Sequence, residues 1–238
     1  GSDFSEGDVL LDAGTLLRPG AVIAAAGADM AEVTVWRRPR VLILGTGDEL
    51  VEPGIAREQS GRIPESVSYG IAALATEAGA EVIGSRRLPD ELSVMRAAAA
   101  ESLGRADVVV VTGGASVGER DFAKAMWDGT GLELVFSKVA IKPGKPVWLG
   151  RAGSTLVIGL PGNPTSALVT GRLFLVPLLY ATAERREDVD ERLGHLLAAN
   201  DFPDPAADRL MAAIRAGVAS PEAFAALGRI CGSKGMVE

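Results

Sequence analysis

The sequence predicts an α/β fold, a three-layer domain in which helices cover both faces of a mostly parallel sheet. From Arg40 onward, short aliphatic runs alternate with segments whose apolar residues recur at helical spacing. Strands that alternate with helices form βαβ units, which place parallel strands in the middle layer and helices on its two faces. In such sheets, ligands bind beyond the carboxyl ends of the strands.

Aliphatic runs give the expected strands, and the periodic segments between them give the expected helices. In Glu65–Ala78 the apolar residues fall on one helical face, with Pro64 before the segment and Gly79 after it. Proline at a helix start and glycine past its end are the usual helix boundaries. The expected strands are Arg40–Leu44, Glu81–Ile83, Asp107–Val111, Leu132–Val139, Val147–Leu149 and Thr155–Ile158, and the expected helices are Glu65–Ala78, Pro89–Leu103 and Thr165–Ala183.

Three parts of the chain differ in composition. Residues 1–38 contain short apolar runs separated by glycines and Pro19, and this pattern predicts a partial β-rich domain. Residues 39–183 form the α/β domain. Residues 184–238 begin with a dense charge run and continue with alanine-rich helical patterns, so the fold of this segment stays open. The short strands expected in the first part are Asp8–Leu11, Ala21–Ile23 and Glu32–Val35.

Composition limits the classes of function. The formal net charge of −7 at pH 7 argues against nucleic acid as the main partner. A single cysteine, Cys231, excludes an intrachain disulfide and a CxxC metal or redox site. The apolar segment Ala167–Ala183 is interrupted by polar residues and is too short for a membrane span, so we expect no membrane partner. No charged leader with an apolar core opens the chain, which favours a cytoplasmic protein.

Four loops that follow expected strands carry the candidate chemistry, and the first is Gly45–Leu50. Its glycines allow close backbone approach, Thr46 supplies a hydroxyl, and Asp48 with Glu49 supplies paired carboxylates. Such a pair can hold Mg²⁺ or act as acid and base. A structural turn that leaves a strand would have the same composition.

The second loop, Val111–Asp121, combines backbone donors with a hydroxyl and a carboxylate. Gly113 and Gly114 can adopt conformations closed to other residues, which leaves their N–H groups free to face an anion. Ser116 can donate a hydrogen bond to a phosphate. Asp121 precedes an expected helix, so it either serves the ligand or caps that helix.

The remaining two loops offer cations and a helix start. Lys142 and Lys145 lie three residues apart in Ala140–Pro146, where two prolines restrict the backbone, and together they can neutralise a phosphate or molybdate. Leu160–Ser166 follows a strand and precedes a long helix, an arrangement that suits anion binding or an ordinary turn.

In combination these loops resemble the molybdenum cofactor biosynthesis family, specifically the molybdopterin molybdenumtransferases (MoeA-like and gephyrin E domain-like). The resemblance runs from about Asp3 to Ala181, and it implies a molybdopterin-binding, MogA-like α/β domain. It rests on Thr46–Leu50, Thr112–Gly118, Lys142–Pro146 and Pro161–Pro164, which occur in the order of the family, and on the upstream runs Gly7–Leu11 and Val33–Val35.

The resemblance implies insertion of molybdate into adenylylated molybdopterin, with hydrolysis of the adenylyl group assisted by Mg²⁺. It further implies a homodimer, contact with the adenylyltransferase, and contact with recipient molybdoenzymes. The implied catalytic residues are Asp48, Glu49, Asp121, Lys142 and Lys145, with Glu49 and Asp121 as metal ligands. The implied pterin-binding residues are Thr46, Gly47, Thr112, Gly113, Gly114, Ser116, Pro143, Gly144, Pro161, Gly162, Asn163 and Ser166.

The sequence also departs from the family pattern. Val67 stands where the family usually has asparagine, Gly1-Ser2 falls inside the β-rich part, and the tail from Ala183 lacks the β-rich pattern of the family's last domain. We therefore expect a fragment without the N-terminal part. Two alternatives remain open: a non-catalytic molybdopterin-binding module, and a pterin adenylyltransferase-type enzyme, in which Thr-Gly would follow the position of Gly114.

Overall fold

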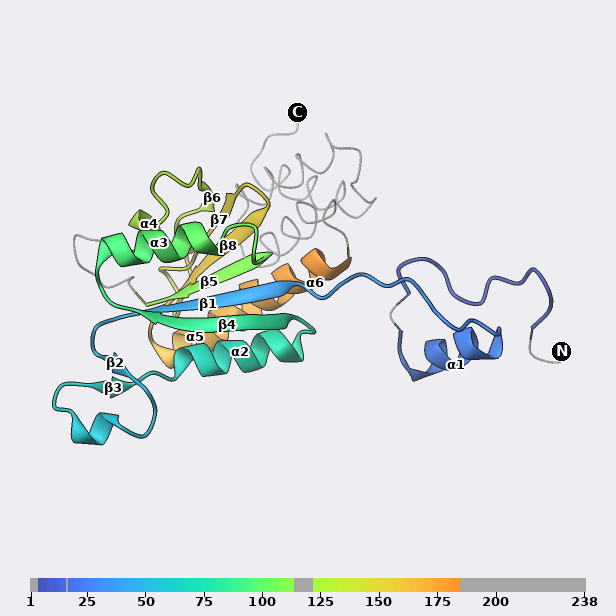
Figure 1. Ribbon diagram of the computed structural model, residues 1–238, viewed down its shortest axis with the longest axis horizontal. Coiled ribbons are helices and arrows are strands. Elements are labelled where there is room, and N and C mark those ends of the chain that lie inside the picture. Colours follow the sequence, from blue (N-terminus) through green and yellow to red (C-terminus); the bar gives the residue numbers. More distant parts are fainter. Residues whose placement is uncertain (1–3, 16, 114–121, 185–238) are drawn as a thin grey trace, which may run out of the picture. The chain divides into compact units, whose positions relative to one another are not determined.

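A computed structural model describes residues 4–15, 17–113 and 122–184 (Figure 1). The contacts divide the chain into two units, Gly1–Arg37 and Arg38–Glu238. Gly114, Ser116 and Asp121, together with the tail beyond Glu184, lie outside the described residues.

The described part of the first unit contains one helix, α1 (Pro19–Gly27), and no strand. The prediction of a strand at Ala21–Ile23 was wrong, because these residues are helical, and Asp8–Leu11 and Glu32–Val35 form no strand. Pro19 occupies the first turn, and three alanines follow Ile23. Alanine is the best helix former and proline suits the first turn, so together they outweigh the β-branched pair. No residue of α1 is buried.

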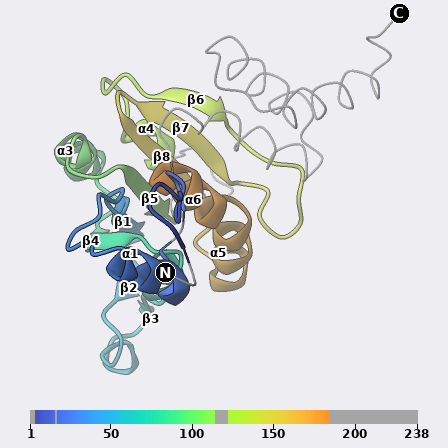
Figure 2. The ribbon, with the colours of Figure 1, turned by 90° about the vertical axis from the view of Figure 1, so that its right-hand side faces the viewer.

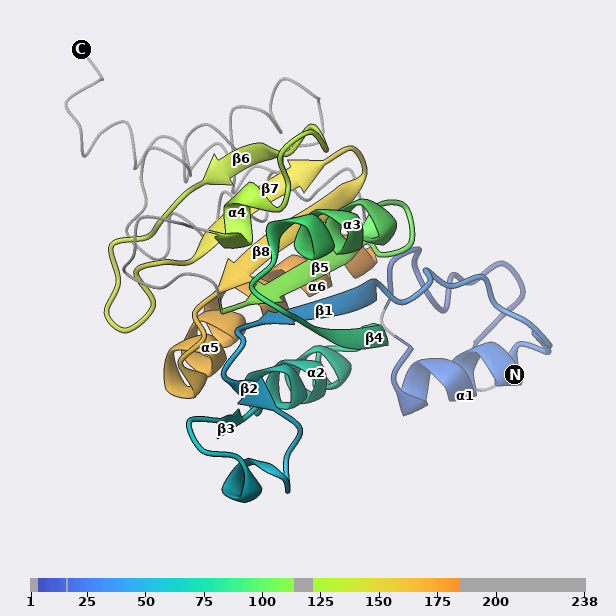
Figure 3. The ribbon, with the colours of Figure 1, turned by 60° about the vertical axis from the view of Figure 1, so that its left-hand side comes forward.

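The second unit is built on a six-stranded sheet with the order β4-β1-β5-β8-β7-β6 (Figure 3). β4, β1, β5 and β8 run parallel, whereas β7 is antiparallel to both β8 and β6. This confirms the expected mostly parallel sheet. The strands are β1 (Arg40–Thr46), β4 (Glu81–Leu88), β5 (Val108–Thr112), β6 (Glu133–Phe136), β7 (Trp148–Ala152) and β8 (Thr155–Leu160).

A small lobe follows β1 and was not predicted. It contains two short parallel strands, β2 (Leu50–Val51) and β3 (Ile63–Pro64), with a turn of 3-10 helix at Ala56–Glu58 between them. We call residues 50–64 the β2–β3 lobe. Strands of two residues carry no readable alternation, so sequence periodicity cannot reveal them.

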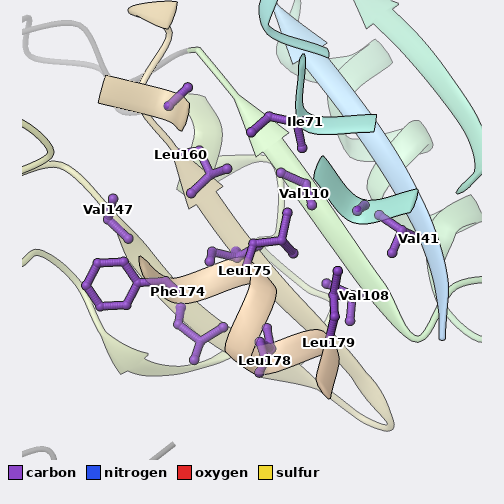
Figure 4. Packing of buried hydrophobic residues seen from close by; sticks show 14 of the residues in the cluster. Val41, Ile71, Val108, Val110, Val147, Leu160, Phe174, Leu175, Leu178 and Leu179 are labelled. Atoms are coloured by element: carbon purple, nitrogen blue, oxygen red, sulfur yellow. The ribbon is translucent and has the colours of Figure 1, made fainter. Parts of the chain in front are cut away.

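Helices cover both faces of the sheet, as expected (Figure 2). α2 (Val67–Glu77), α5 (Pro164–Thr170) and α6 (Val176–Glu184) pack on one face, and α3 (Leu92–Ser102) and α4 (Phe122–Ala125) pack on the other. Side chains alternate along each strand: Val108 and Val110 enter the first core, and Val109 and Val111 enter the second. Figure 4 shows the first core, in which Leu175 and Leu179 pack against valines of the sheet.

The segment Pro164–Ala183 is one continuous helical stretch, in which a π-helical turn at Gly171–Leu175 joins α5 to α6. The prediction considered only Ala167–Ala183, whereas the full stretch Pro164–Ala183 is long and apolar enough, by length and composition alone, to cross a membrane. Half of its apolar window is buried inside the fold. Phe174, Leu175 and Leu179 belong to the core on the sheet, which is the environment of a core helix.

Candidate functional site

The carboxyl ends of three parallel strands meet at one edge of the sheet. Thr112, the last residue of β5, pairs with Gly45 of β1 and with Leu160, the last residue of β8. The chain leaves this edge through Gly47, Gly113 and Pro161, which belong to three of the four loops singled out from the sequence. The parallel register therefore brings these three loops together.

At this edge, backbone packs directly against backbone. A Cβ atom on Gly113 would overlap the main-chain O of Thr46, and its φ of +83° is a conformation that favours glycine. A Cβ on Gly162 would lie 3.2 Å from the Cα of Gly113. The hydroxyl of Thr46 donates to the main-chain O of Thr112 at 3.2 Å. Gly113 thus lets the loop after β5 approach the end of β1 closely, and Gly162 lets the loop after β8 approach Gly113.

The lysine loop leaves the same edge. It joins β6 to β7, and Trp148 at the start of β7 pairs with Gly159 near the carboxyl end of β8. Two main-chain hydrogen bonds close the loop, from Val139 N to Lys145 O at 3.0 Å and from Val147 N to Gly144 O at 3.1 Å.

Contacts with α5 fix this loop further. Gly144 lies so close to the side chain of Thr170 that a Cβ would overlap it. Lys142 and Lys145 are exposed, and no described residue forms an ion pair with either ammonium. The backbone is therefore held while the cations stay available to an anion.

The start of α5 is closed by its own cap. The Oδ1 of Asn163 accepts hydrogen bonds from the N–H of Ser166 at 3.1 Å and from its hydroxyl at 3.3 Å. Asn163 is therefore the N-cap, a role that removes one of the helix's unpaired donors. Pro161 and Gly162 remain at the strand end, where Gly162 meets Gly113.

The paired carboxylates of the first loop have different surroundings. Asp48 exchanges hydrogen bonds with Asp90, from Asp90 N to Asp48 Oδ1 at 3.0 Å and from Asp48 N to Asp90 Oδ2 at 3.4 Å. A side chain of Arg62 donates to the main-chain O of Asp48. Asp48 therefore joins the first loop to the segment between β4 and α3, and its carboxylate oxygen Oδ1 already accepts a hydrogen bond.

The carboxylate of Glu49 lies close to Gly47. Its carboxylate oxygens lie 2.9 Å from where a Cβ of Gly47 would be, and its main-chain O accepts a hydrogen bond from Ile63 N at 2.9 Å. Glu49 is exposed, so its carboxylate is the open one of the pair.

Asp90 was not singled out from the sequence. Partial burial raises the pKa of its carboxyl, the N–H of Asp48 acts in the opposite direction, and the negative charges of Asp48 and Glu49 raise it further. The available signal was its place directly after β4, whose carboxyl end lies at the same edge as that of β1.

Two buried polar residues at the start of α2 were also missed. Glu65 accepts a hydrogen bond from the N–H of Ser68 at 2.8 Å, and both residues are buried. The hydroxyl of Ser68 would lie 3.2 Å from a Cβ on Gly45, beside Thr112. Sequence reasoning placed Glu65 in a helix, whereas α2 begins at Val67, and only the fold brings Ser68 to the end of β1.

The described residues contain no group of three histidine, cysteine, aspartate or glutamate side chains able to hold a metal ion. Of the two predicted metal ligands, Glu49 is described and Asp121 lies outside the described residues. The same holds for Gly114 and Ser116 of the second loop.

Close glycine packing at the carboxyl ends of parallel strands, with two exposed lysines on a loop that leaves the same edge, is the arrangement of α/β domains that bind anions. The chain belongs to the family described as "Probable molybdopterin binding domain", whose model matches residues 42–181.

Relatives with curated names agree with this assignment. A molybdopterin molybdenumtransferase of Haemophilus influenzae is 41% identical over 179 residues, which are 75% of this chain and 44% of the relative. One of Bacillus subtilis is 35% identical over 205 residues, which are 86% of this chain and 47% of the relative. The chain thus spans less than half the length of these relatives.

A solved structure agrees as well. The molybdopterin biosynthesis MoeA protein of Pyrococcus horikoshii superposes with a TM-score of 0.64 at 30% sequence identity, covering 73% of this chain and 43% of that one. The expected family and fold class are therefore confirmed, and the chain corresponds to a part of these longer proteins.

Proposed function

We propose that this chain is the molybdopterin-binding part of a molybdopterin molybdenumtransferase, which inserts molybdate into adenylylated molybdopterin. The observation that carries the proposal is the meeting of Gly113, Gly162 and Thr46 at an edge from which the lysine loop also projects. Backbone donors and cations at one place suit a ligand with phosphate groups.

The phosphate end of the pterin would be held at this glycine edge. Lys142 and Lys145 would neutralise the phosphate or molybdate. The N–H and hydroxyl donors would come from Thr46, Gly47, Thr112, Gly113, Gly114 and Ser116. Because the lysine loop is closed by its own backbone hydrogen bonds, Pro143 and Gly144 would keep both ammonium groups on the ligand side. The segment between β8 and the first turn of α5 would form one side of the binding site, with Pro161, Gly162, Asn163 and Ser166.

Mg²⁺ is implied by the family resemblance, and the open carboxylate of Glu49 fits it. This ion is usually held by one or two carboxylates together with waters and substrate phosphates, so it does not require a cluster of three protein ligands. Glu49 and Asp121 would hold it, and when bound it would offset the charge of the pyrophosphate.

Hydrolysis of the adenylyl group adds water across the pyrophosphate, which breaks the bond to the bridging oxygen and releases AMP and the pterin phosphate. Glu49 and Asp121 would orient the attacking water and receive its proton. Asp48 is bonded to Asp90, so we assign it the task of fixing the loop that carries Glu49. The two lysines would stabilise the charge on the departing phosphate.

A second candidate is a non-catalytic molybdopterin-binding module. The specific observation in its favour is the close glycine packing at the edge from which the lysine loop projects, an arrangement that can hold a phosphate without any catalytic group. We also propose, from the family resemblance, a homodimer in the cytoplasm that contacts the adenylyltransferase and recipient molybdoenzymes. The lone Cys231 fits a reducing compartment.

Calorimetric titration of molybdopterin into the wild-type chain and the double variant Lys142→Ala/Lys145→Ala tests the site. We expect the double variant to bind about a hundredfold more weakly, because two charge-assisted contacts are lost. Lys138→Ala is the matched control, an exposed lysine of the same connection, and should change the affinity by less than about twofold. Equal affinity of the double variant and the wild type would contradict the proposed site.

A turnover assay separates the candidate functions. With adenylylated molybdopterin, Mg²⁺ and molybdate, the wild-type chain should release AMP. Binding without AMP release would favour the binding module. ATP binding in the absence of pterin would instead favour the adenylyltransferase-type enzyme.

A further inference from the structure

The β2–β3 lobe begins directly after Glu49, and little apolar packing holds it. Val51 is its one buried residue, while most of the others from Glu52 to Pro64 are exposed. Apolar burial is the main source of stability in a fold. A segment with so few buried side chains is therefore fixed by its polar contacts or moves independently of the domain.

Main-chain hydrogen bonds couple this lobe to Glu49. The main-chain O of Glu49 accepts from Ile63 N at 2.9 Å, and that of Val51 accepts from Glu65 N at 2.8 Å. The position of Glu49 thus follows that of the returning strand β3. Any contact that fixes the lobe also fixes the residue to which we assign cation and water binding.

One side chain of the lobe joins two elements of the domain. Glu52 accepts a hydrogen bond from the hydroxyl of Tyr69 in α2 at 2.9 Å on one carboxylate oxygen. Its other oxygen lies 3.4 Å from a guanidinium nitrogen of Arg87 in β4. Both oxygens are therefore used, and each contacts a different element. The bond to Glu52 also raises the pKa of the Tyr69 phenol, as expected for a phenol that donates to a carboxylate.

We propose that Glu52 is a positioning residue for the molybdopterin site: held by Tyr69 and Arg87, it fixes the β2–β3 lobe and thereby the position of Glu49. The assignment of a role to Glu49 rests on the proposed function, whereas the fixing of the lobe does not. Exposed ion pairs contribute little to global stability. Small displacements of a catalytic group nevertheless reduce turnover strongly.

The structure provides a matched control on the neighbouring residue of the same strand. Arg86 forms an ion pair with Glu101 of α3 at 2.6 Å, and both partners are exposed, as Arg87 and Glu52 are. This pair joins β4 to α3 and does not contact the lobe. Glu101→Ala therefore removes an equivalent carboxylate without affecting the contacts of Glu49.

Amide hydrogen exchange of the full chain tests directly whether Glu52 fixes the β2–β3 lobe. Glu52→Ala should accelerate exchange of the Ile63 amide about tenfold, because that N–H is bonded to Glu49 itself. Tyr69→Phe keeps the ring, removes one bond, and should give a smaller increase of about threefold. Glu101→Ala should leave this amide unchanged, and amides of β1 and β5 serve as the internal reference. Exchange in Glu52→Ala equal to that in Glu101→Ala would overturn the proposal.

Steady-state turnover of adenylylated molybdopterin tests the consequence for the site. We expect Glu52→Ala to lower kcat about tenfold with KM and Tm close to those of the wild type, because phosphate binding by the lysine loop is untouched. Faster exchange with unchanged kcat would also overturn the proposal. A wild-type chain without turnover would count against the proposed function. Exchange of the Ile63 amide would then decide by itself whether Glu52 fixes the lobe.

Discussion

At the amino ends of β1, β5 and β8, side chains tie the strands together, whereas at their carboxyl ends glycines bring backbone against backbone. Asp107 accepts a hydrogen bond from the N–H of Arg40 at 2.8 Å and pairs with its guanidinium at 3.5 Å. Thr155 donates to the main-chain O of Ala106 at 3.0 Å. At the other end, a Cβ on Gly113 would overlap the main-chain O of Thr46, and a Cβ on Gly162 would be in tight contact with Gly113.

Together with the proposed function, this difference assigns stability to one end of the three strands and ligand binding to the other. At the amino end, the side chains of Asp107 and Thr155 form hydrogen bonds with backbone groups where β1 and β5 begin. At the carboxyl end, Gly113 and Gly162 bring backbone segments into close contact, and the lysine loop leaves the same edge. Side-chain hydrogen bonds therefore connect the strands at the amino end, whereas close backbone contacts connect them at the carboxyl end, where we propose that the ligand binds. The same division is typical of parallel sheets that bind ligands at their carboxyl edge.

The largest effect should come from filling the glycine edge. In Gly113→Ala the new Cβ meets the main-chain O of Thr46, which is backbone and cannot rotate away. We expect a loss of about 2–4 kcal/mol in the free energy of unfolding, since both the strained φ and the overlap contribute. Molybdopterin affinity should fall by at least about a hundredfold. Urea unfolding and calorimetry measure the two effects.

The amino edge supplies the control for this substitution. Gly104 has a comparable φ of +73°, but nothing lies within 4 Å of its Cβ position. Gly104→Ala should therefore cost only the backbone strain, about 1–2 kcal/mol, with unchanged ligand affinity. If both variants lose the same stability, close packing at the carboxyl edge is not what distinguishes the two ends.

An intermediate effect is expected from removing the charge at the amino end. Asp107→Asn keeps the shape of the buried side chain and loses its ion pair with the half-exposed Arg40. We expect a destabilisation of about 1–2 kcal/mol by urea unfolding and an affinity for molybdopterin within about twofold of the wild type. A large loss of affinity would show that the two ends are coupled.

The smallest effect concerns pH at the carboxyl end. Because the folded-state pKa of Asp90 is raised, the stability that comes from its protonated form is fully present below the unfolded-state pKa and is lost as pH rises through the folded-state pKa. Asp90→Asn removes this dependence while keeping an acceptor for Asp48 N. Relative to the wild type, the free energy of unfolding of the variant should therefore increase by less than about 1 kcal/mol between acid and neutral pH. Urea unfolding at several pH values measures the difference, and parallel curves for the two proteins would contradict it.

Elements with strong periodicity could be predicted from the sequence. The aliphatic run at Val108–Val111 and the one-faced apolar pattern around Ile71 and Ala75 gave β5 and α2 within a few residues. The helix at Pro19–Gly27 was missed because Val22 and Ile23 suggested a strand. The β-branched pair favours a strand, whereas the proline before it and the alanines after it favour a helix, and the helix forms.

In the candidate site, the sequence alone identified the loops that follow strands. Glycines, hydroxyls, carboxylates and lysines at strand ends are visible in a sequence, because backbone freedom and charge are properties of single residues. The tertiary structure alone decided which of them share an edge and which are already engaged. The register of β1, β5 and β8 placed Gly113 against Thr46, and folding brought Asp90 to Asp48 and Tyr69 to Glu52. Contacts between residues 17 or 42 positions apart depend on how the elements pack, and no local pattern of residue types encodes them.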